Sequence, residues 1–475
     1  MNIYDIIKRE TEKVSSKIAV IEDRDSITYG DLLAAANRVA VTLHKKGVSR
    51  LHRVGLLCDD SIDYIIMSLA ILSLSAVIVP VSTEQTAEEI EDVIDRIDVD
   101  FLIAEPSLRQ GGYGEALQSE GLFKKQFIFA KRTVRERPKA EYFRINPAFI
   151  RFTSGTTGTS KGVVLSHEAI VERTDAADKG LQITSQDTVL WVLSMSFHFV
   201  VTILLFLRRG ATVVLCGHRY PTSLIEGVRA HKGTVIYASP FYYSLLSRTE
   251  ALPGDVLEHI RLAISTAMKL PDQVAESFLA KFGFELTEAY GIIEVGLPFI
   301  RLSGTRDKRG SVGRPLPDFE IALDKKDADG VGEIRIKGKG MLDAYYSPWQ
   351  GREDILSDGW FKTGDLGKID GEGFLTIVGR DKDVINFVGM KVFALEVESV
   401  LNRHPQVRES LVYGAAHPHY GQLPMAKIVL REESGVPDAN DLRRYCYQHL
   451  ARYKVPKDFE FVGQLPKTAS GKLKR

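Results

Sequence analysis

Apolar positions follow two alternating patterns from about residue 17 to residue 240. Short β-branched runs such as IAVIE and RVGLLC have the length and composition of buried strands. Between them lies TYGDLLAAANRVAVTLHKKG, an amphipathic run of helical length with Thr28 placed as an N-cap and Gly47 after its last periodic residue. This alternation predicts an α/β fold of parallel βαβ units, with doubly wound sheets covered by helices on both faces.

The pattern changes twice in the second half of the chain. Short strand-like runs separated by Pro, Gly and Asp begin near residue 310 and predict a small β-rich subdomain. Further on, ALEVESVLNRHPQV is expected to be a helix, and DANDLRRYCYQHLARYKVP a second helix stopped by Pro456. Charge and glycine concentrate in GRDKDVI, which favours a domain boundary there. The predicted units are a large N-terminal domain over residues 1–379, including the β-rich subdomain over 310–379, a hinge over 380–382, and a small mobile α+β C-terminal domain over 383–475.

One apolar run has two interpretations, because residues 64–81 carry no charge over 18 positions. That length is the lower limit for a membrane-spanning helix. The run contains three serines, however, and it divides into a helix-like part and a β-rich part. We therefore expect a buried helix followed by a buried strand, and no membrane span.

The composition is that of a soluble globular protein, with 475 residues, 44% apolar and 26% charged. Lys plus Arg and Asp plus Glu number 62 each, so no net charge favours nucleic acid or an acidic membrane surface. Cys58, Cys216 and Cys446 are too far apart for a metal motif or a disulfide framework. The N-terminal run has charges where a signal peptide needs an apolar core, and a reducing cytoplasm is the expected location.

The tract TSGTTGTSKG at residues 153–162 combines three glycines, six hydroxyl side chains and one lysine. Such composition is typical of a flexible linker or of a loop that wraps a polyphosphate. The strand-like flanks PAFIRF and VVLSH favour the loop, whose glycines let backbone N–H groups approach an anion. Lys161 lies between Ser160 and Gly162, so the tract is neither a Walker A loop nor a dinucleotide-binding turn.

Four motifs in order complete the pattern: FTSGTTGTSKGVVLSH, AYGIIEVG, GWFKTGDLGKIDGEGFLTIVGRDKDVINFVGMKVFALEVE and LPKTASGKLKR. Together they resemble the adenylate-forming superfamily of acyl- and aryl-CoA synthetases, peptide-synthetase adenylation domains and beetle luciferases. The resemblance extends from about residue 17 to the last residue. It implies ATP- and Mg²⁺-dependent conversion of a carboxylic acid to an acyl-adenylate, followed by transfer to a thiol.

The resemblance also implies roles for individual residues. Glu294 would help to hold Mg²⁺, Tyr290 would stack near the adenine, and Asp365, together with Arg380, would bind the ribose. Lys472 would be the catalytic lysine that draws the carboxylate and the α-phosphate together. The full set of ATP and AMP contacts implied by the motifs is Thr153, Ser154, Gly155, Thr156, Thr157, Gly158, Lys161, Tyr290, Gly291, Asp365 and Arg380.

A rotation of the small C-terminal domain would let one active site serve both reactions. Lys382 falls at the family's hinge, about which the C-terminal domain would rotate after adenylation. That rotation would remove Lys472 and bring the loop around Gly389 to line a tunnel for the pantetheine arm. Coenzyme A is the expected acceptor, and the phosphopantetheine of a carrier protein is the alternative, because both thiols share this arm.

The chain departs from the family at Ile293, where relatives usually carry Thr or Ser. Loss of that hydroxyl is expected to weaken transition-state binding by roughly 1–3 kcal/mol unless Thr153 or Thr266 replaces it. This departure motivates an alternative of another class, a catalytically weak nucleotide- or acyl-binding protein. Retention of Lys472, Asp365 and Glu294 argues against it.

The acyl pocket is expected to take a hydrophobic acid, aryl or of medium chain length. Phe197 stands where amino-acid-activating relatives place an aspartate, and an unpaired ammonium group there would cost several kcal/mol. His198 resembles the histidine that lies beside the substrate carboxylate in acyl- and aryl-CoA ligases. The other candidate pocket residues are Phe199, Phe241, Tyr242, Thr266, Ala267 and Gly296.

Overall fold

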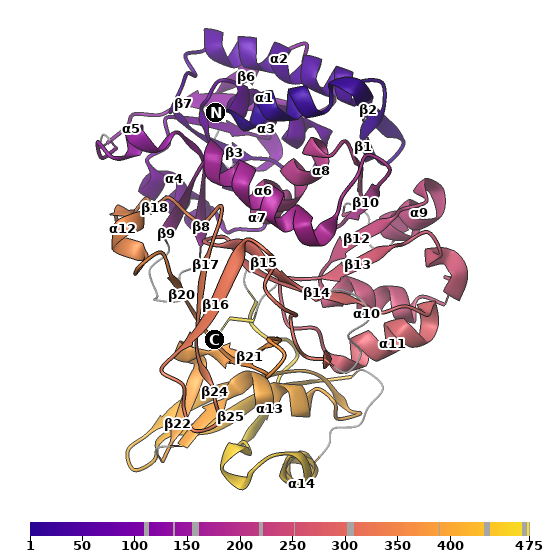
Figure 1. The fold of residues 1–475 in the computed structure, drawn as a ribbon, viewed down its shortest axis with the longest axis vertical. Helices are drawn as coiled ribbons and strands as arrows, with labels where there is room; N and C mark the ends of the chain where they lie inside the picture. Colours follow the sequence, from indigo (N-terminus) through magenta and orange to yellow (C-terminus); the bar gives the residue numbers. More distant parts are fainter. Residues whose placement is uncertain are drawn as a thin grey trace.

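The computed structural model describes most of the chain and confirms the predicted α/β fold class. The described residues are 1–108, 114–135, 138–153, 161–217, 222–250, 252–301, 308–388, 390–431, 438–467 and 473–474. Their strands form sheets of nine, eight, four and five strands. Figure 1 shows the two large sheets in the upper part of the molecule, the four-stranded sheet below them and the five-stranded sheet at the bottom.

The nine-stranded sheet has the order β19-β18-β9-β8-β4-β3-β5-β7-β6. Its central strands β8, β4, β3 and β5 are parallel, and the other strands join them antiparallel. The strands are β3 (Arg53–Leu57), β4 (Val77–Val81), β5 (Phe101–Ala104), β6 (Glu115–Leu117), β7 (Phe127–Lys131), β8 (Pro147–Thr153), β9 (Lys161–Ser166), β18 (Ala344–Tyr345) and β19 (Gln350–Gly351). The antiparallel pair β8 and β9 flanks the glycine-rich tract, as the sequence predicted.

The eight-stranded sheet has the order β15-β14-β13-β12-β10-β11-β1-β2. It is parallel from β14 to β1, and an antiparallel strand closes each edge. The strands are β1 (Ile18–Glu22), β2 (Asp25–Thr28), β10 (Thr188–Trp191), β11 (Thr212–Leu215), β12 (Val235–Ala238), β13 (Leu262–Ser265), β14 (Thr287–Ile292) and β15 (Gly296–Ile300).

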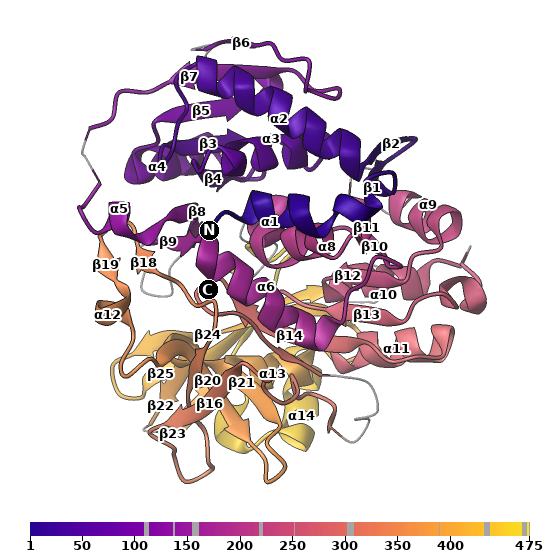
Figure 2. The same ribbon diagram turned by 45° about the horizontal axis from the view of Figure 1, so that its top comes forward.

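Helices cover both large sheets and also fill the space between them. The central α6 contacts β8 and β9 of one sheet and β15 of the other, and Figure 2 shows it with α1 and α8 between the two sheets. The helices of this region are α1 (Ile3–Glu10), α2 (Tyr29–Lys45), α3 (Ile62–Ser73), α4 (Ala87–Ile97), α5 (Tyr142–Ile145), α6 (His167–Leu181), α7 (Met195–His198), α8 (Leu204–Arg208), α9 (Thr222–His231), α10 (Pro240–Arg248) and α11 (Asp272–Phe282).

Local sequence rules account for α2 and for the uncharged run. The Thr28 hydroxyl accepts a hydrogen bond from the Asp31 N–H, which caps α2. Gly47 follows the helix with φ of 97°, a value that favours glycine. Residues 64–81 form most of α3 and all of β4, and β4 is buried along its whole length. In the described part of the chain, no helix combines the length and the apolarity needed to cross a bilayer.

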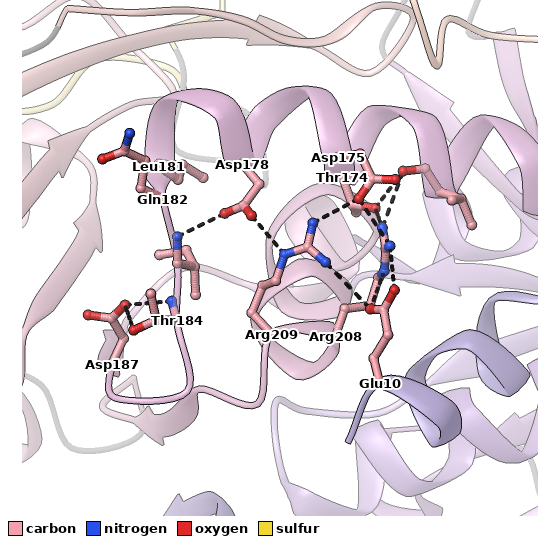
Figure 3. A network of polar contacts seen from close by, with 12 residues as sticks. Glu10, Thr174, Asp175, Asp178, Leu181, Gln182, Thr184, Asp187, Arg208 and Arg209 are labelled. Atoms are coloured by element: carbon pink, nitrogen blue, oxygen red, sulfur yellow. Dashed lines mark hydrogen bonds and ion pairs between the residues drawn. The ribbon is translucent and has the colours of Figure 1, made fainter. Parts of the chain in front are cut away.

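An ion-pair network fastens α1 and α8 to the central helix (Figure 3). Arg208 at the end of α8 pairs with Glu10 at 2.9 Å and donates to the Thr174 hydroxyl at 2.5 Å. The next residue, Arg209, pairs with Asp175 at 2.8 Å and with Asp178 at 2.7 Å. Asp175 and Asp178 belong to α6, and Arg209 also pairs with Glu10 of α1 at 3.5 Å, so the two guanidinium groups connect three helices.

The β-rich region forms a four-stranded antiparallel sheet in the order β16-β17-β20-β21. Its strands are β16 (Phe319–Asp324), β17 (Gly332–Gly338), β20 (Phe361–Ile369) and β21 (Leu375–Arg380), and α12 (Arg352–Ile355) precedes β20. Ile334, Ile336 and Leu375 are fully buried and belong to the same apolar core as the two large sheets. This sheet therefore packs as part of the N-terminal region.

The C-terminal region begins after a 3-10 turn over Asp381–Asp383. It contains β22 (Val384–Phe387), β23 (Met390–Phe393), α13 (Ala394–Leu401), β24 (Val407–His417), β25 (Gly421–Leu430), α14 (Ala439–His449) and β26 (Phe459–Phe461). The residues at the centre of this region, such as Val397, Val412 and Ile428, form a separate apolar cluster. The domain boundaries given above remain predictions.

Both C-terminal helices are shorter than the sequence predicted. The first ends at Leu401, because Val407 already pairs with Leu430 in the β24–β25 hairpin. The second ends at His449, where Leu450 is extended, well before Pro456. The helical pattern was extended too far in both cases, since tertiary pairing decides where the helix stops.

Candidate functional site

Tyr290, Asp365 and Arg380 form one contact set on three different strands. The Tyr290 hydroxyl on β14 donates to Asp365 Oδ2 on β20 at 2.5 Å. Arg380 Nε on β21 lies 3.0 Å from Asp365 Oδ1, and the Asp365 side chain is only 6% exposed. Burial and the neighbouring Asp365 charge raise the pKa of Tyr290, so its hydroxyl stays a donor.

The register of the β20–β21 hairpin explains this arrangement. Asp365 and Arg380 are direct partners across the antiparallel pair, so their side chains lie on the same face. The Thr363 hydroxyl accepts from the Asp365 N–H at 3.0 Å and donates to the Ile334 carbonyl at 2.9 Å. The carboxylate is thus held from two sides, and its remaining lone pairs are free to accept hydrogen bonds from vicinal hydroxyls.

Glu294 lies in the turn between β14 and β15, and its neighbours hold the backbone of that turn. Arg173 of α6 donates to the Ile293 carbonyl at 3.0 Å, and the Leu342 N–H donates to the Glu294 carbonyl at 2.7 Å. Arg173 also donates twice to the Gly340 carbonyl, at 2.9 and 2.6 Å. A Cβ atom at Gly340 would lie 2.4 Å from the Arg173 nitrogen, so this close approach requires glycine.

Tyr345 lies between Glu294 and Lys161. Its hydroxyl is 3.4 Å from Glu294 Oε1, and Lys161 Nζ lies 4.5 Å from the centre of its ring. Lys161 also donates to Gln350 Oε1 at 3.1 Å. Burial raises the pKa of the Glu294 carboxyl, and the positive charge of Arg151 partly offsets this effect.

Glu294 fits the role of a single protein ligand to Mg²⁺. Magnesium usually keeps several waters and binds through one or two carboxylates together with substrate phosphates. The described residues contain no group of three or more His, Cys, Asp or Glu arranged for a metal ion. The residues present therefore suit a metal that arrives with a nucleotide and not an all-protein metal site.

The helix that ends at His198 is fixed at its start by a buried acid. The Met195 N–H donates to both oxygens of Asp60, at 2.9 and 3.0 Å. His198 meets the Trp191 indole edge-on, with 6.0 Å between the ring centres. Phe197 lies beneath Arg151, whose guanidinium carbon is 5.8 Å from the ring centre and whose Nη1 donates to the Phe197 carbonyl. The segment from Met195 to His198 is thus held at its start by Asp60 and near its end by Arg151.

The remaining candidate pocket residues occupy different environments. Phe199 is 1% exposed and packs edge-on against Tyr64, which makes it part of the core. Phe241 is 63% exposed, and the hydroxyl of Tyr242 donates to the Val192 carbonyl at 3.1 Å. Thr266 is buried, Ala267 has φ of 72°, and Gly296 has φ of 99°. Membership of an acyl pocket stays a prediction for all of them.

Several candidate residues lie outside the described part of the chain. These are residues 154–160 of the glycine-rich tract, Gly389 and Lys472. Thr153 closes β8, where its backbone pairs with Lys161. A Cβ atom on Gly291 would lie 2.3 Å from the Gly296 carbonyl oxygen, so that glycine serves the β14–β15 pairing. Lys382 is exposed in the 3-10 turn over Asp381–Asp383, which connects β21 of the four-stranded sheet to β22 of the five-stranded sheet.

Sequence reasoning missed Arg151, Tyr345 and Trp191 as neighbours of the site. Arg151 had a visible signal, because it is a charged residue within the apolar strand that leads into the glycine-rich tract. Tyr345 and Trp191 had none, since an aromatic residue in a strand-like run is usually a core residue.

Family models match two parts of the chain. Residues 7–346 match the AMP-binding enzyme model, and residues 396–472 match the model of the AMP-binding enzyme C-terminal domain. A 2-succinylbenzoate–CoA ligase of Bacillus subtilis (strain 168) is 30% identical over 99% of this chain and 96% of its own length.

Solved structures agree with these matches. ATP-bound MatB from Rhodopseudomonas palustris superposes with a TM-score of 0.86 at 25% identity, covering 100% of this chain and 97% of that one. The o-succinylbenzoate CoA synthetase MenE from Bacillus subtilis, in complex with its acyl-adenylate intermediate, has a TM-score of 0.84 at 26% identity and the same coverage. The expected fold and reaction class, an acid–thiol ligase, are confirmed. The chain therefore belongs to the AMP-binding enzyme family.

Proposed function

We propose that the protein uses ATP and Mg²⁺ to convert a hydrophobic carboxylic acid to an acyl-adenylate and then transfers the acyl group to coenzyme A. The observation that carries this proposal is the contact set of Tyr290, Asp365 and Arg380. Three separate segments of the chain meet there around a buried carboxylate whose free lone pairs suit ribose hydroxyls. The CoA ligase names of the similar proteins support the choice of thiol.

In the first half-reaction a carboxylate oxygen of the acid attacks the α-phosphorus of ATP, and pyrophosphate leaves. We assign the β- and γ-phosphates to residues 153–161, because a tract rich in glycine and hydroxyl side chains, together with Lys161, suits a polyphosphate. Mg²⁺ would neutralise phosphate charge, with Glu294 as its protein ligand. Lys472 would bridge the carboxylate and the α-phosphate, and His198 would orient the carboxylate.

In the second half-reaction the thiol attacks the acyl carbon, and AMP leaves. We propose that the C-terminal region, residues 383–475, rotates about Lys382 between the two steps. The separate apolar cluster of this region and the exposed turn over Asp381–Asp383 support a pivot at this point. Gly389 would then line the passage for the pantetheine arm. The three cysteines are buried free thiols, and we propose a cytoplasmic location because such thiols suit a reducing compartment.

The first test is ATP–pyrophosphate exchange across a panel of aryl and medium-chain acids. Exchange should require ATP, Mg²⁺ and one class of acid, and it should proceed without thiol. Thioester formation is then measured with coenzyme A and, separately, with a phosphopantetheinylated carrier protein. Thioester on the carrier alone would replace the CoA assignment, whereas ATP binding with no exchange for any acid would support a nucleotide-binding protein.

The second test separates the two half-reactions. Lys472→Ala should abolish acyl-adenylate formation, because the bridging cation is lost, and it should leave thioester formation from supplied acyl-adenylate largely intact. Lys474→Ala is the matched control, since it removes a lysine two residues away and should leave both steps unchanged. Equal loss of both half-reactions in Lys472→Ala would contradict the assigned role.

A further inference from the structure

Arg151, two residues before the glycine-rich tract, is a half-buried cation to which the described residues offer few partners. In the described part of the chain, Nη1 donates to the Phe197 carbonyl, while Nε is buried and has no hydrogen-bond partner. No carboxylate of a described residue forms an ion pair with it, although Glu294 is near enough to raise its pKa. Burial lowers the pKa of Arg151 to about 10, so the guanidinium is still charged at neutral pH.

Three buried arginines in the described part of the chain have more partners than Arg151, whereas Arg301 resembles it in having a buried Nε without a hydrogen-bond partner. Arg53 has the Asp100 carboxylate at 3.0 Å, and Arg208 has that of Glu10 at 2.9 Å. Arg173 has no ion pair of this kind but directs three hydrogen bonds to two carbonyl groups. Burying a guanidinium is costly unless an anion or several acceptors compensate. Among the described residues Arg151 has one acceptor, so most of its N–H groups have no partner there.

Arg151 is connected to three parts of the candidate site. Its own strand, β8, continues into the glycine-rich tract. Its Nη1 acceptor, the Phe197 carbonyl, immediately precedes His198. The Glu294 carboxylate is near enough to raise the pKa of Arg151.

We propose that the Arg151 guanidinium binds an oxyanion of the adenylation step, and that it supplies the donor missing at Ile293. The oxyanion is the α-phosphate of ATP or the carboxylate of the acid, both of which meet beside His198 under the proposed function. Ile293 is a buried apolar side chain next to Glu294. A planar guanidinium with spare N–H groups is the chemical equivalent of more than one hydroxyl donor.

The test uses Arg151→Met and Arg151→Lys, each alone and combined with Ile293→Thr, in ATP–pyrophosphate exchange. Arg151→Met should lower kcat/KM on the order of 10- to 100-fold, the usual consequence of losing a charge-assisted hydrogen bond. Arg151→Lys should retain more activity because it keeps the charge. Ile293→Thr should restore part of the loss in the Arg151→Met background, because its hydroxyl supplies a donor.

Separate KM values identify the oxyanion. A rise in the KM for ATP alone assigns the α-phosphate, and a rise in the KM for the acid alone assigns the carboxylate. Thermal unfolding of each variant without ligand shows whether the fold is kept. Wild-type exchange in Arg151→Met would overturn the inference, and so would equal losses of activity and melting temperature in the Met and Lys variants.

A failure of the proposed function remains distinguishable from a failure of this inference. If the wild-type protein catalyses no exchange, the proposed function fails. Equilibrium binding of benzoyl-adenylate, which carries both the phosphate and the acyl group, then decides the inference. Arg151→Met must bind this probe more weakly than the wild type, and equal affinity would refute an oxyanion contact.

Discussion

Replacing Asp365 by Asn tests whether the buried carboxylate binds the ribose. At present its Oδ2 accepts from the Tyr290 hydroxyl at 2.5 Å, and its Oδ1 faces Arg380 Nε at 3.0 Å. An asparagine offers one acceptor oxygen and one amide nitrogen of nearly the same shape. One of the two donors must therefore face an N–H group in the variant, and the negative charge that attracts ribose hydroxyls is lost.

The expected loss of affinity follows from these contacts. A hydrogen bond to a charged acceptor contributes about 1 kcal/mol more than one between neutral groups. Two ribose hydroxyls that donate to the carboxylate would together lose about 2 kcal/mol, which corresponds to a roughly 30-fold weaker binding of ATP.

The assay is calorimetric titration with ATP and with 2′,3′-dideoxy-ATP, which lacks the hydroxyls. Asp365→Asn should weaken ATP binding and leave the affinity for the dideoxy nucleotide nearly unchanged. Asp370→Asn is the control, because Asp370 follows the same strand, is 40% exposed and pairs with Lys308 at 2.8 Å. Equal losses for both nucleotides would refute the reasoning and make Asp365 a purely structural residue.

Three further predictions concern stability, pH and the pivot. Arg208→Met should lower the free energy of unfolding by about 2–3 kcal/mol, because it removes the bonds of a buried guanidinium to Glu10 and to the Thr174 hydroxyl. Arg209→Met, at a side chain that is 26% exposed, should cost about 1 kcal/mol, and denaturant titration measures both. Similar costs would contradict the role of burial. Burial raises the pKa of Glu294, so its ionised, metal-binding form is lost as the pH falls through that raised value. Adenylation should decline on the acid side at a higher pH than an ordinary glutamate predicts, and Glu294→Gln should remove this limb of the pH profile. Lys382→Pro should slow thioester formation more than adenylation in stopped-flow measurements of each step, and unchanged kinetics would exclude a pivot there.

Local signals predicted those elements whose boundaries depend on nearby residues. Thr28 and Gly47 mark the start and the end of α2, because an N-cap hydroxyl and a left-handed glycine act within one turn of the helix. The uncharged run divides into α3, which ends at Ser73, and β4, which begins where the β-branched residues start at Val77. The first C-terminal helix was overextended because the chain pairs with β25 from Val407 onward, and the second because the chain becomes extended at Leu450.

The contact set at Asp365 could be expected only through the family motifs. Tyr290 and Asp365 are 75 residues apart, and neither pattern nor composition relates two such positions. Arg151 differs from these residues, because its unusual position, a charge within an apolar strand, is visible in the sequence. Its neighbours, Phe197 and Glu294, come from distant segments, so its lack of an ion pair appears only after folding.

The turn at Glu294 explains how the family geometry survives the replacement at Ile293. The carbonyl of Ile293 accepts a hydrogen bond from Arg173, and the carbonyl of Glu294 accepts one from the Leu342 N–H, so both donors lie outside the turn. Neither contact involves the side chain of residue 293, which is buried against the apolar core. A hydroxyl at this position is therefore not needed to place the Glu294 carboxylate. Under the proposed function, we therefore expect the replacement to change the donors available to the reacting phosphate and to leave the Glu294 carboxylate in place, so that it affects the chemical step and not the fold.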